Sequence, residues 1–289
     1  MDNIKGIIRK NNIRLTKALG QNFLNDEGIV NRIVDAADVG KEDVVIEIGP
    51  GIGSMTHELC KRAGEVFAVE IDARLIPVLA QNLKGFSNLH IINNDVMKLD
   101  LKRDIISLLS PERKPEAVKV AANLPYYITT PIIMKLLEEN PGIDSMVFMV
   151  QKEVAERMTA APGGKDYGAL SLAVQYYSRP RAVFDVPPHC FIPQPGVYST
   201  VIRLDIFKTP PVTVKSEELF FKIVKAAFGQ RRKTLLNALS NSGCLAQGKQ
   251  DIRQVLEDTG IGESRRGETL SIEQFAQLSN AFFEKGNSL

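Results

Sequence analysis

The stretch that decides the fold is Val44-Val45-Ile46-Glu47-Ile48-Gly49-Pro50-Gly51-Ile52-Gly53. Its first half is a β-branched run, which is typical of a buried strand, and its second half is a glycine-rich turn. Helix-compatible sequence then leads to a second apolar run at residues 65–70. This succession of strand, glycine turn, helix and strand predicts the first unit of a parallel α/β sheet.

The same pattern continues on the C-terminal side of this unit. Further strands are predicted at residues 89–93, 118–122, 145–150 and 201–205, with helical stretches between several of them. After the break at Thr209-Pro210-Pro211, helices are predicted at residues 217–228, 232–239, 249–259 and 272–283. The predicted fold class is therefore α/β, with a Rossmann-like, mostly parallel sheet in residues 1–207 and a small all-helical domain in residues 208–289.

The charge is distributed unevenly along the chain. The 289 residues carry a net charge of +2, but residues 208–289 hold 12 Lys and Arg against 9 Asp and Glu. A basic arm occupies the first 17 residues, with Lys5, Arg9, Lys10, Arg14 and Lys17. This distribution suits a polyanionic partner, and ordinary solvated charge is the alternative.

Other compositional features exclude several classes of protein. Cys60, Cys190 and Cys244 are far apart and odd in number, which predicts reduced structural thiols rather than disulfides or a zinc site. The chain has only three histidines, so we expect no metal. No signal peptide or bilayer-spanning run is evident, and we expect a cytoplasmic protein that does not enter a membrane.

The glycine turn predicts a nucleotide-like ligand. Glycines where a strand meets a helix let a ligand approach the backbone and the helix N-terminus closely. The dinucleotide fingerprint G-x-G-x-x-G would require glycine at position 54, where this chain has Ser54. The spacing G-x-G-x-G, formed by Gly49, Gly51 and Gly53, favours S-adenosylmethionine over NAD.

Two acidic residues follow the next two strands of the predicted sheet. Glu70, at the end of the second strand, is placed to accept hydrogen bonds from both ribose hydroxyls of such a ligand. Asp95, after the third strand, is placed to accept from the exocyclic amine of its adenine. Each is weak evidence alone, because an acidic residue in a turn is common, but their order along the chain supports a cofactor pocket.

Asn123-Leu124-Pro125-Tyr126, after the fourth strand, has the residue types needed to methylate an amine conjugated to a ring. The Asn123 side-chain oxygen and a neighbouring backbone carbonyl would accept the two N–H bonds of an adenine N6, and Pro125 removes a competing donor. Tyr126 offers a face for an extruded base. A simple turn is the alternative for these four residues taken alone.

The chain resembles the rRNA adenine N6-dimethyltransferase family over nearly its whole length, and within that family the KsgA type. The matching motifs are Lys17-Ala18-Leu19-Gly20-Gln21-Asn22-Phe23-Leu24, residues 47–53, Val69-Glu70-Ile71-Asp72, Asn94-Asp95-Val96, Asn123-Leu124-Pro125-Tyr126-Tyr127, Gln151-Lys152-Glu153-Val154-Ala155, Phe191-Ile192-Pro193-Gln194-Pro195-Gly196-Val197-Tyr198-Ser199 and residues 228–235.

This resemblance implies a class I S-adenosylmethionine methyltransferase fold and a set of site residues. Asn22, Leu24, Gly49, Glu70, Asp95 and Asn123 would surround the cofactor. Phe191 would stack on the target base opposite Tyr126. Asn22, Leu24 and Phe191 rest on the resemblance alone, since by themselves they are typical of a helix cap and of core residues.

The resemblance also implies a substrate. KsgA-type enzymes dimethylate two adjacent adenines near the 3′ end of 16S rRNA in the 30S subunit or its precursor, and we expect a monomer with the same activity and a role in small-subunit biogenesis. Arg231, Arg232 and Lys233 would contact rRNA phosphates.

Three other functions remain open at this point. One is a 23S rRNA methylase that gives macrolide resistance. Another is a ribosome-assembly factor whose catalysis is dispensable, and this role is compatible with methylation. The third is an NAD-dependent oxidoreductase, which lacks its third glycine here and leaves the residues from Asn123 to Tyr126 unexplained.

Overall fold

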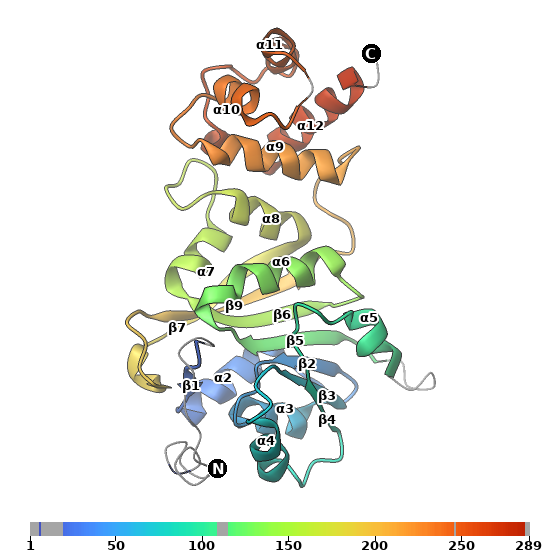
Figure 1. The fold of residues 1–289 in the computed structure, drawn as a ribbon, viewed down its shortest axis with the longest axis vertical. Coiled ribbons are helices and arrows are strands. Elements are labelled where there is room, and N and C mark those ends of the chain that lie inside the picture. Colours follow the sequence, from blue (N-terminus) through green and yellow to red (C-terminus); the bar gives the residue numbers. More distant parts are fainter. Residues whose placement is uncertain (1–5, 7–19, 109–114, 246, 287–289) are drawn as a thin grey trace. The chain divides into compact units, whose positions relative to one another are not determined.

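The computed structural model describes Gly6 and residues 20–108, 115–245 and 247–286. The chain forms two compact units (Figure 1). The sheet unit comprises Met1–Ala155 and Arg179–Ile206, and the helical unit comprises Glu156–Ser178 and Phe207–Leu289. The basic arm expected in the first 17 residues lies outside the described residues, apart from Gly6.

A seven-stranded sheet forms the centre of the sheet unit. Its strands lie in the order β4 (Leu89–Asn93), β3 (Glu65–Glu70), β2 (Val44–Ile48), β5 (Val118–Asn123), β6 (Ser145–Gln151), β9 (Ser199–Ile206) and β7 (Ser178–Val186). The pairings from β4 to β6 are parallel, and β9 runs antiparallel to β6. The carboxyl ends of five strands therefore meet at one edge, where open α/β sheets bind their ligands.

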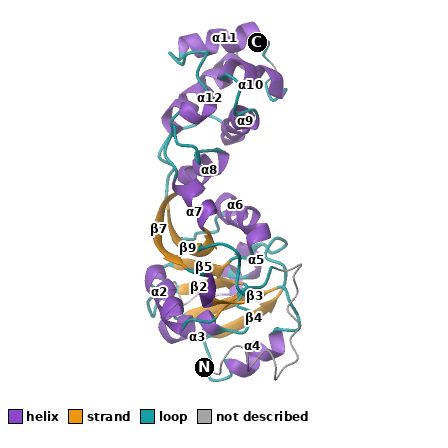
Figure 2. Ribbon diagram, turned by 90° about the vertical axis from the view of Figure 1, so that its left-hand side faces the viewer, coloured by secondary structure: helices purple, strands orange, loops and turns teal. Residues whose placement is uncertain are grey.

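Helices cover the sheet because its central strands are apolar on both faces. All five residues of β2 are buried. The helices of this unit are α2 (Glu27–Ala37), α3 (Ser54–Arg62), α4 (Ile76–Asn82), α5 (Leu101–Asp104) and α6 (Thr129–Glu139), and α7 (Lys152–Thr159) begins in it. Figure 2 shows α2 and α3 on one side of the sheet and α6 on the other.

Local sequence explains how α2 is placed. The Asp26 carboxylate caps its N-terminus by accepting a hydrogen bond of 3.0 Å from the Ile29 backbone N–H. The helix ends at Asp38, which has a left-handed backbone with φ of 52°. Its buried residues recur every three or four positions, so one apolar stripe packs on the sheet: Ile29, Val30, Ile33, Val34 and Ala37.

A small second sheet lies beside the main one. It consists of β1 (Phe23–Leu24) and β8 (Phe191–Ile192), which pair antiparallel with Leu24 opposite Phe191. The pairing holds the segment that follows Gly20 against the segment that precedes β9. Two regions far apart in the sequence are thereby fixed next to the carboxyl edge of the main sheet.

The helical unit has its own hydrophobic core. Its helices are α8 (Ala169–Tyr177), α9 (Glu217–Gly229), α10 (Leu235–Ser242), α11 (Lys249–Asp258) and α12 (Ile272–Gly286). Phe220, Leu239 and Phe275 are fully buried in this core. The Tyr167 hydroxyl, which lies before α8, donates a buried hydrogen bond of 3.0 Å to the Leu270 carbonyl.

The expected α/β sheet and the helical C-terminal part are confirmed. The division of the chain differs from the single boundary expected after residue 207, because Glu156–Ser178 clusters with the helical unit. The reason is packing, since Tyr167, Leu172 and Tyr176 bury their side chains in the same core as α9 and α12. Among the described residues, no helix is long and apolar enough to cross a membrane.

Candidate functional site

A cavity opens at the carboxyl edge of the sheet. It encloses about 880 Å³, including the solvent at its mouth. Its walls come from the segment around β1, the turn after β2, the end of β3 and the turn after β5. The lining includes Gln21, Asn22, Leu24, Glu47, Gly49, Gly51, Glu70, Ile71, Asn123, Leu124, Pro125 and Tyr126. The structure thus brings together most of the residues predicted for the cofactor site.

The glycine turn between β2 and α3 forms the floor of this cavity. Gly49 and Gly51 both have left-handed backbones, with φ of 70° and 60°, which other residues adopt only with strain. At Gly51 space is also restricted, because a Cβ there would lie 2.8 Å from the Phe23 ring. Substitution of Gly51 therefore disturbs both the turn and the β1 segment that borders the cavity.

Glu70 lies at the end of β3 with its carboxylate fixed by the backbone. One carboxylate oxygen accepts from the Gly51 N–H at 3.1 Å, and the other accepts from the Asp72 N–H at 2.8 Å. Burial raises the pKa of Glu70 above its ordinary value. Each carboxylate oxygen has two acceptor sites, so each retains capacity for a ligand hydroxyl.

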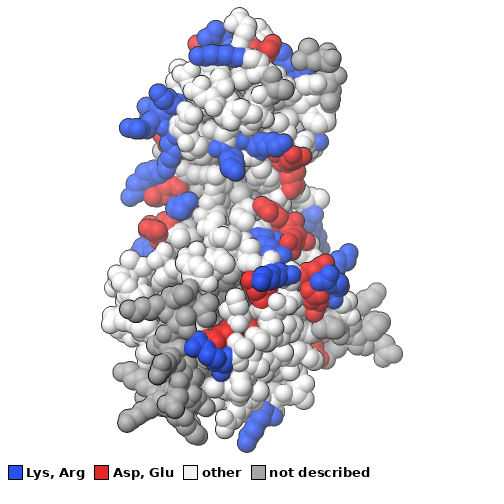
Figure 3. All heavy atoms as spheres, in the orientation of Figure 1, with Lys and Arg blue, Asp and Glu red and all other residues white. Residues whose placement is uncertain are grey.

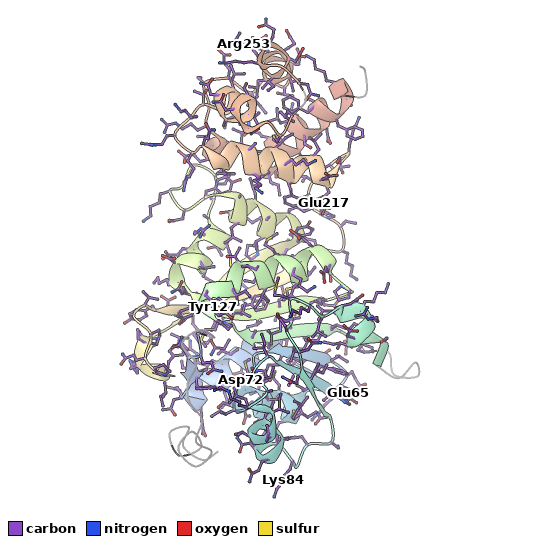
Figure 4. The ribbon with its side chains drawn as sticks, viewed as in Figure 1. Glu65, Asp72, Lys84, Tyr127, Glu217 and Arg253 are labelled. Carbon is purple, nitrogen blue, oxygen red and sulfur yellow. The ribbon has the colours of Figure 1, made fainter. Side chains whose placement is uncertain are left out.

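Asp72 holds the rim of the cavity next to Glu70. Its carboxylate accepts a hydrogen bond of 3.0 Å from the Gln21 side chain, which lines the cavity. It also pairs with Arg74 at 2.6 Å, and this hydrogen-bonded pairing lowers the pKa of Asp72. The segment that precedes β1 is thereby tied to the end of β3; Figure 4 labels Asp72.

Glu47 is a cavity residue that was not assigned a role from the sequence. It lies within β2, is 1% exposed, and its Oε2 has no hydrogen-bond partner among the described residues. Burial raises its pKa to about 8, so the carboxyl is largely protonated at neutral pH. A carboxyl within an otherwise apolar buried strand is the sequence signal that would have identified it.

Asn123 lies at the end of β5 with its side chain oriented by a hydrogen bond. Its Nδ2 donates to the Asn22 carbonyl at 2.9 Å, which leaves the side-chain oxygen as the group available to a donor. The Pro125 carbonyl already accepts from Ile128 N at 3.2 Å and from Thr129 Oγ1 at 3.0 Å. The carbonyl of Leu124, which also lines the cavity, is the candidate for the second acceptor.

Tyr126 begins the short 3₁₀ turn η3 (Tyr126–Ile128) and closes one side of the cavity. Its hydroxyl forms a hydrogen bond of 2.7 Å with Ser199 Oγ at the start of β9. Burial raises the pKa of the Tyr126 hydroxyl, so the ring carries no charge at neutral pH. A neutral, anchored ring at a cavity wall is a suitable surface for a planar base.

Of the residues predicted to bind the cofactor or the target base, two are not among those that line the cavity. Asp95 follows β4 and stabilises its own turn, since Asp95 Oδ1 accepts from Met97 N at 3.0 Å. Phe191 is 3% exposed and packs with Leu24 in the core of the sheet unit. Leu24 connects Phe191 to the cavity, because Leu24 lines the cavity and pairs with Phe191 across β1 and β8.

The three basic residues predicted to contact RNA lie in the helical unit. They occupy the exposed turn between α9 and α10, not a helix, because α10 begins only at Leu235. Arg231 donates to the Lys165 carbonyl at 2.8 Å and pairs with Glu268 at 3.1 Å. Arg232 and Lys233 follow it in the same turn. Figure 3 shows Lys and Arg side chains gathered on the side of this unit that carries the turn.

The described residues contain no cluster of three or more His, Cys, Asp or Glu side chains placed to hold a metal ion. The three cysteines are free thiols, and two of them, Cys60 and Cys190, are buried. Neither lines the cavity.

Comparison with known proteins identifies the family. The sequence model of the family described as "Ribosomal RNA adenine dimethylase" matches residues 12–283. The chain belongs to this family. This family member is 56% identical over 281 residues to the "Ribosomal RNA small subunit methyltransferase A" of Alkaliphilus oremlandii, and the match covers 97% of this chain and 96% of the relative. It is 50% identical to the protein of the same name from Clostridioides difficile, covering 98% and 96%.

Solved structures agree with the family assignment. A dimethyladenosine transferase from Plasmodium falciparum is 27% identical, with a TM-score of 0.77, and the match covers 91% of this chain and 98% of that one. The 23S rRNA methyltransferase ErmE is 25% identical, with a TM-score of 0.66, and the match covers 90% and 99%. The expected class I methyltransferase fold is therefore confirmed for this ribosomal RNA adenine dimethylase family member.

Proposed function

We propose that this protein uses S-adenosylmethionine to dimethylate the N6 amines of two adjacent adenines near the 3′ end of small-subunit rRNA. The observation that carries the proposal is the orientation of the Asn123 side chain. Its amide nitrogen is engaged by Asn22, so its oxygen is left to accept an N–H at the edge of a cavity suited to a nucleoside. Relatives named for small-subunit methylation share about half of the sequence or more.

The cavity fits the cofactor in the chemistry of its walls. Gly49 and Gly51 leave the backbone open beside the N-terminus of α3, and Glu70 retains acceptor capacity for the two ribose hydroxyls. Asn22, Leu24 and Asn123 complete the predicted set at the cavity wall. Asp95 belongs to the same proposal as the residue that receives the adenine amine, from its place after β4. When bound, the cofactor supplies a methyl group activated by a sulfonium.

The Asn123 side chain and the Leu124 carbonyl are proposed to orient the target adenine and to reduce the preference of its N6 amine for a planar geometry. An N6 lone pair is delocalised into the base, which makes the nitrogen a poor nucleophile. Acceptance of its two N–H bonds by the Asn123 oxygen and the Leu124 carbonyl favours a pyramidal nitrogen with its lone pair free. Tyr126 supports one face of the base, and Phe191 is proposed for the other. Proximity then provides much of the rate, and we propose that no metal takes part.

The RNA is proposed to reach this cavity as part of a folded particle. An adenine in a loop costs less to extrude than one inside a duplex, which suits 16S rRNA in the 30S subunit or its precursor. Arg231, Arg232 and Lys233 are proposed phosphate contacts, and the helical unit is the proposed RNA-binding domain. We propose that the protein is cytoplasmic and monomeric. Sedimentation of the purified protein tests the monomeric state.

The test is a labelling experiment with three substrates. Purified protein and radiolabelled S-adenosylmethionine are incubated with unmethylated 30S subunits, 50S subunits and naked 23S rRNA, and the labelled nucleoside is identified after digestion. We expect N6,N6-dimethyladenosine from 30S subunits only. Label in 23S rRNA would instead place the activity with that of ErmE.

Absence of label from all three substrates would contradict the proposed catalysis. In that case, binding of immature small subunits by the same preparation would favour an assembly role. An NADH titration monitored by fluorescence serves as a control for the cofactor, and we expect no binding.

A further inference from the structure

The cavity residue Tyr126 and its hydrogen-bond partner Ser199 each have an exposed tyrosine as a neighbour in the chain. Tyr127 is 59% exposed and Tyr198 is 52% exposed. The residue before Tyr198, Val197, is 47% exposed. The Tyr198 carbonyl accepts a backbone hydrogen bond of 3.0 Å from Lys152 N, but among the described residues the ring and hydroxyl of neither tyrosine make a hydrogen bond or a ring contact. We call Tyr127, Val197 and Tyr198 the aromatic rim.

The aromatic rim is tied to the site through two observed contacts. Tyr127 and Tyr198 each lie one residue from the Tyr126–Ser199 hydrogen bond of 2.7 Å, which joins η3 to β9. A Cβ on Gly20 would lie 3.2 Å from Cδ1 of Tyr127, so this ring lies over the backbone of a cavity residue. Figure 4 labels Tyr127, which follows β5 at the same edge of the sheet where Asp72 follows β3.

Exposed apolar side chains that are grouped on a surface often mark an interaction site. The five large hydrophobic residues that are exposed in the described chain all belong to the sheet unit, and three of them form the aromatic rim. Unpaired bases are recognised mainly by stacking on aromatic rings, because every base has a π face. Tyrosine also offers a hydroxyl at the ring edge for a polar contact.

We propose that the aromatic rim binds the unstacked base next to the target adenine, which is the second adenine of the pair while the first is being methylated. This rests on the proposed function. An adenine in the cavity leaves its neighbour one backbone step outside, where it has lost a stacking partner. A tyrosine at the mouth replaces that partner, so the neighbour is held ready to enter after the first dimethylation. Tyr127 and Tyr198 are positioning residues in this scheme, since neither contacts the reacting nitrogen.

The test compares Tyr127→Ala, Tyr198→Ala and the double variant with wild type on unmethylated 30S subunits. Tyr127→Phe and Tyr198→Phe are matched controls that keep the ring, and Val183→Ala is a control at an exposed apolar residue of β7. The measurements are kcat and KM for 30S subunits, the fraction of rRNA dimethylated at one adenine only, and the Kd for S-adenosylmethionine by calorimetry.

We expect each alanine variant to lower kcat/KM by about ten-fold, mainly through KM, as is typical for loss of one base–aromatic stack. Singly modified rRNA accumulates in these variants, whereas the Phe and Val183 variants resemble wild type. The Kd for S-adenosylmethionine is unchanged in all of them. A merely structural role of the tyrosines would lower stability without changing the ratio of singly to doubly modified rRNA.

Alanine variants with wild-type kinetics and product ratio would overturn the proposal while the methylation activity stands. A change of sedimentation in the alanine variants, with unaltered RNA kinetics, would also overturn it and assign the aromatic rim to a protein interface. Failure of wild type to methylate any substrate refutes the proposed function instead, so the two failures are distinguishable.

Discussion

Asn123 has one hydrogen bond that determines the direction of its whole amide group. Asn123 Nδ2 donates to the Asn22 carbonyl at 2.9 Å. The side-chain oxygen is therefore already oriented toward its donor, and no free energy is needed to orient it during the reaction. Preoriented acceptors and donors of this kind typically contribute about 100-fold or more to a rate. The same bond joins two residues that are 101 positions apart in the sequence.

Asn123→Ala is therefore expected to lower methylation of 30S subunits by at least about 100-fold. Its S-adenosylmethionine Kd should rise only modestly and its melting temperature should change little, since the side chain is only half-buried. Asn241→Ala, an exposed residue of α10, is the control. Near-normal turnover of Asn123→Ala would remove the assignment.

Glu47 makes the stability of the protein depend on pH. Burial raises its pKa from 4.5 to about 8 in the folded chain, so the folded state binds more protons than the unfolded state between these values. Its contribution to stability is fully present below pH 4.5 and is lost as the pH rises toward 8. The loss amounts to a few kcal/mol at most, by the usual conversion of a pKa difference.

Glu47→Gln removes this ionisable group and keeps the shape of the side chain. We expect the melting temperature of the variant, relative to wild type, to increase between pH 5 and pH 8. Glu138→Gln, at an exposed position of α6, is the control, with a difference from wild type that stays nearly constant over the same range. A constant difference for Glu47→Gln as well would show that Glu47 is ionised in the folded protein.

At the scale of elements, the parallel strands β2, β3 and β4 were predictable and the edge strand β7 was not. The strands β2, β3 and β4 begin and end where the sequence predicted, because β-branched runs bounded by turn residues have few alternatives. β7 was missed, because Pro180 and its charged neighbours are unlike a central strand. Its place at the end of the sheet explains the tolerance for proline.

The candidate site was predictable where the chemistry follows a strand directly. Gly49, Glu70 and Asn123 come after three parallel neighbours, so strand order alone brings them to one edge. Asn22 and Leu24 reach the cavity through the two-residue pairing of β1 with β8, which no periodicity reveals. Glu156–Ser178 was placed with the sheet unit because its sequence shows no change in composition, whereas its burial depends on contacts made much later in the chain.

The turn between α9 and α10 contains basic residues of two kinds. Arg231, Arg232 and Lys233 are all exposed. Arg231 also holds the turn through its contacts with Lys165 and Glu268. Removal of Arg232 and Lys233 together is expected to reduce the slope of log K against log salt for binding to 30S subunits by about 1 to 2, because each phosphate contact releases about one counterion. Filter binding at several salt concentrations measures this slope.

The control for the turn is Lys222→Ala, an exposed residue of α9 that pairs with Glu218. An equal reduction of the slope in this variant would assign the effect to the charge of the helical unit as a whole. Arg231→Ala is expected to differ from both, since it also lowers the stability of the helical unit.

At the scale of the whole molecule, two separate cores stabilise two units. The proposed cofactor contacts lie entirely in the sheet unit. Binding of the cofactor therefore raises the free energy of unfolding of that unit. At a ligand concentration of 100 times Kd the added stability is about 2.7 kcal/mol. We expect S-adenosylmethionine to slow amide exchange in β2, β3 and β5 and to leave α10 to α12 nearly unchanged, as measured by mass spectrometry. Equal protection of both units would contradict this expectation.

The path of the chain between the units determines the order in which they are completed during synthesis. β6 leaves the ribosome before residues 156–178, and its neighbour β9 follows only afterwards. At roughly 5–20 residues per second, β6 waits several seconds as an unpaired edge with apolar faces. Such an edge is a template for pairing with other chains. A nascent protein that stalls between residues 156 and 198 is therefore the form of this molecule most in need of a chaperone, although the finished sheet is well covered.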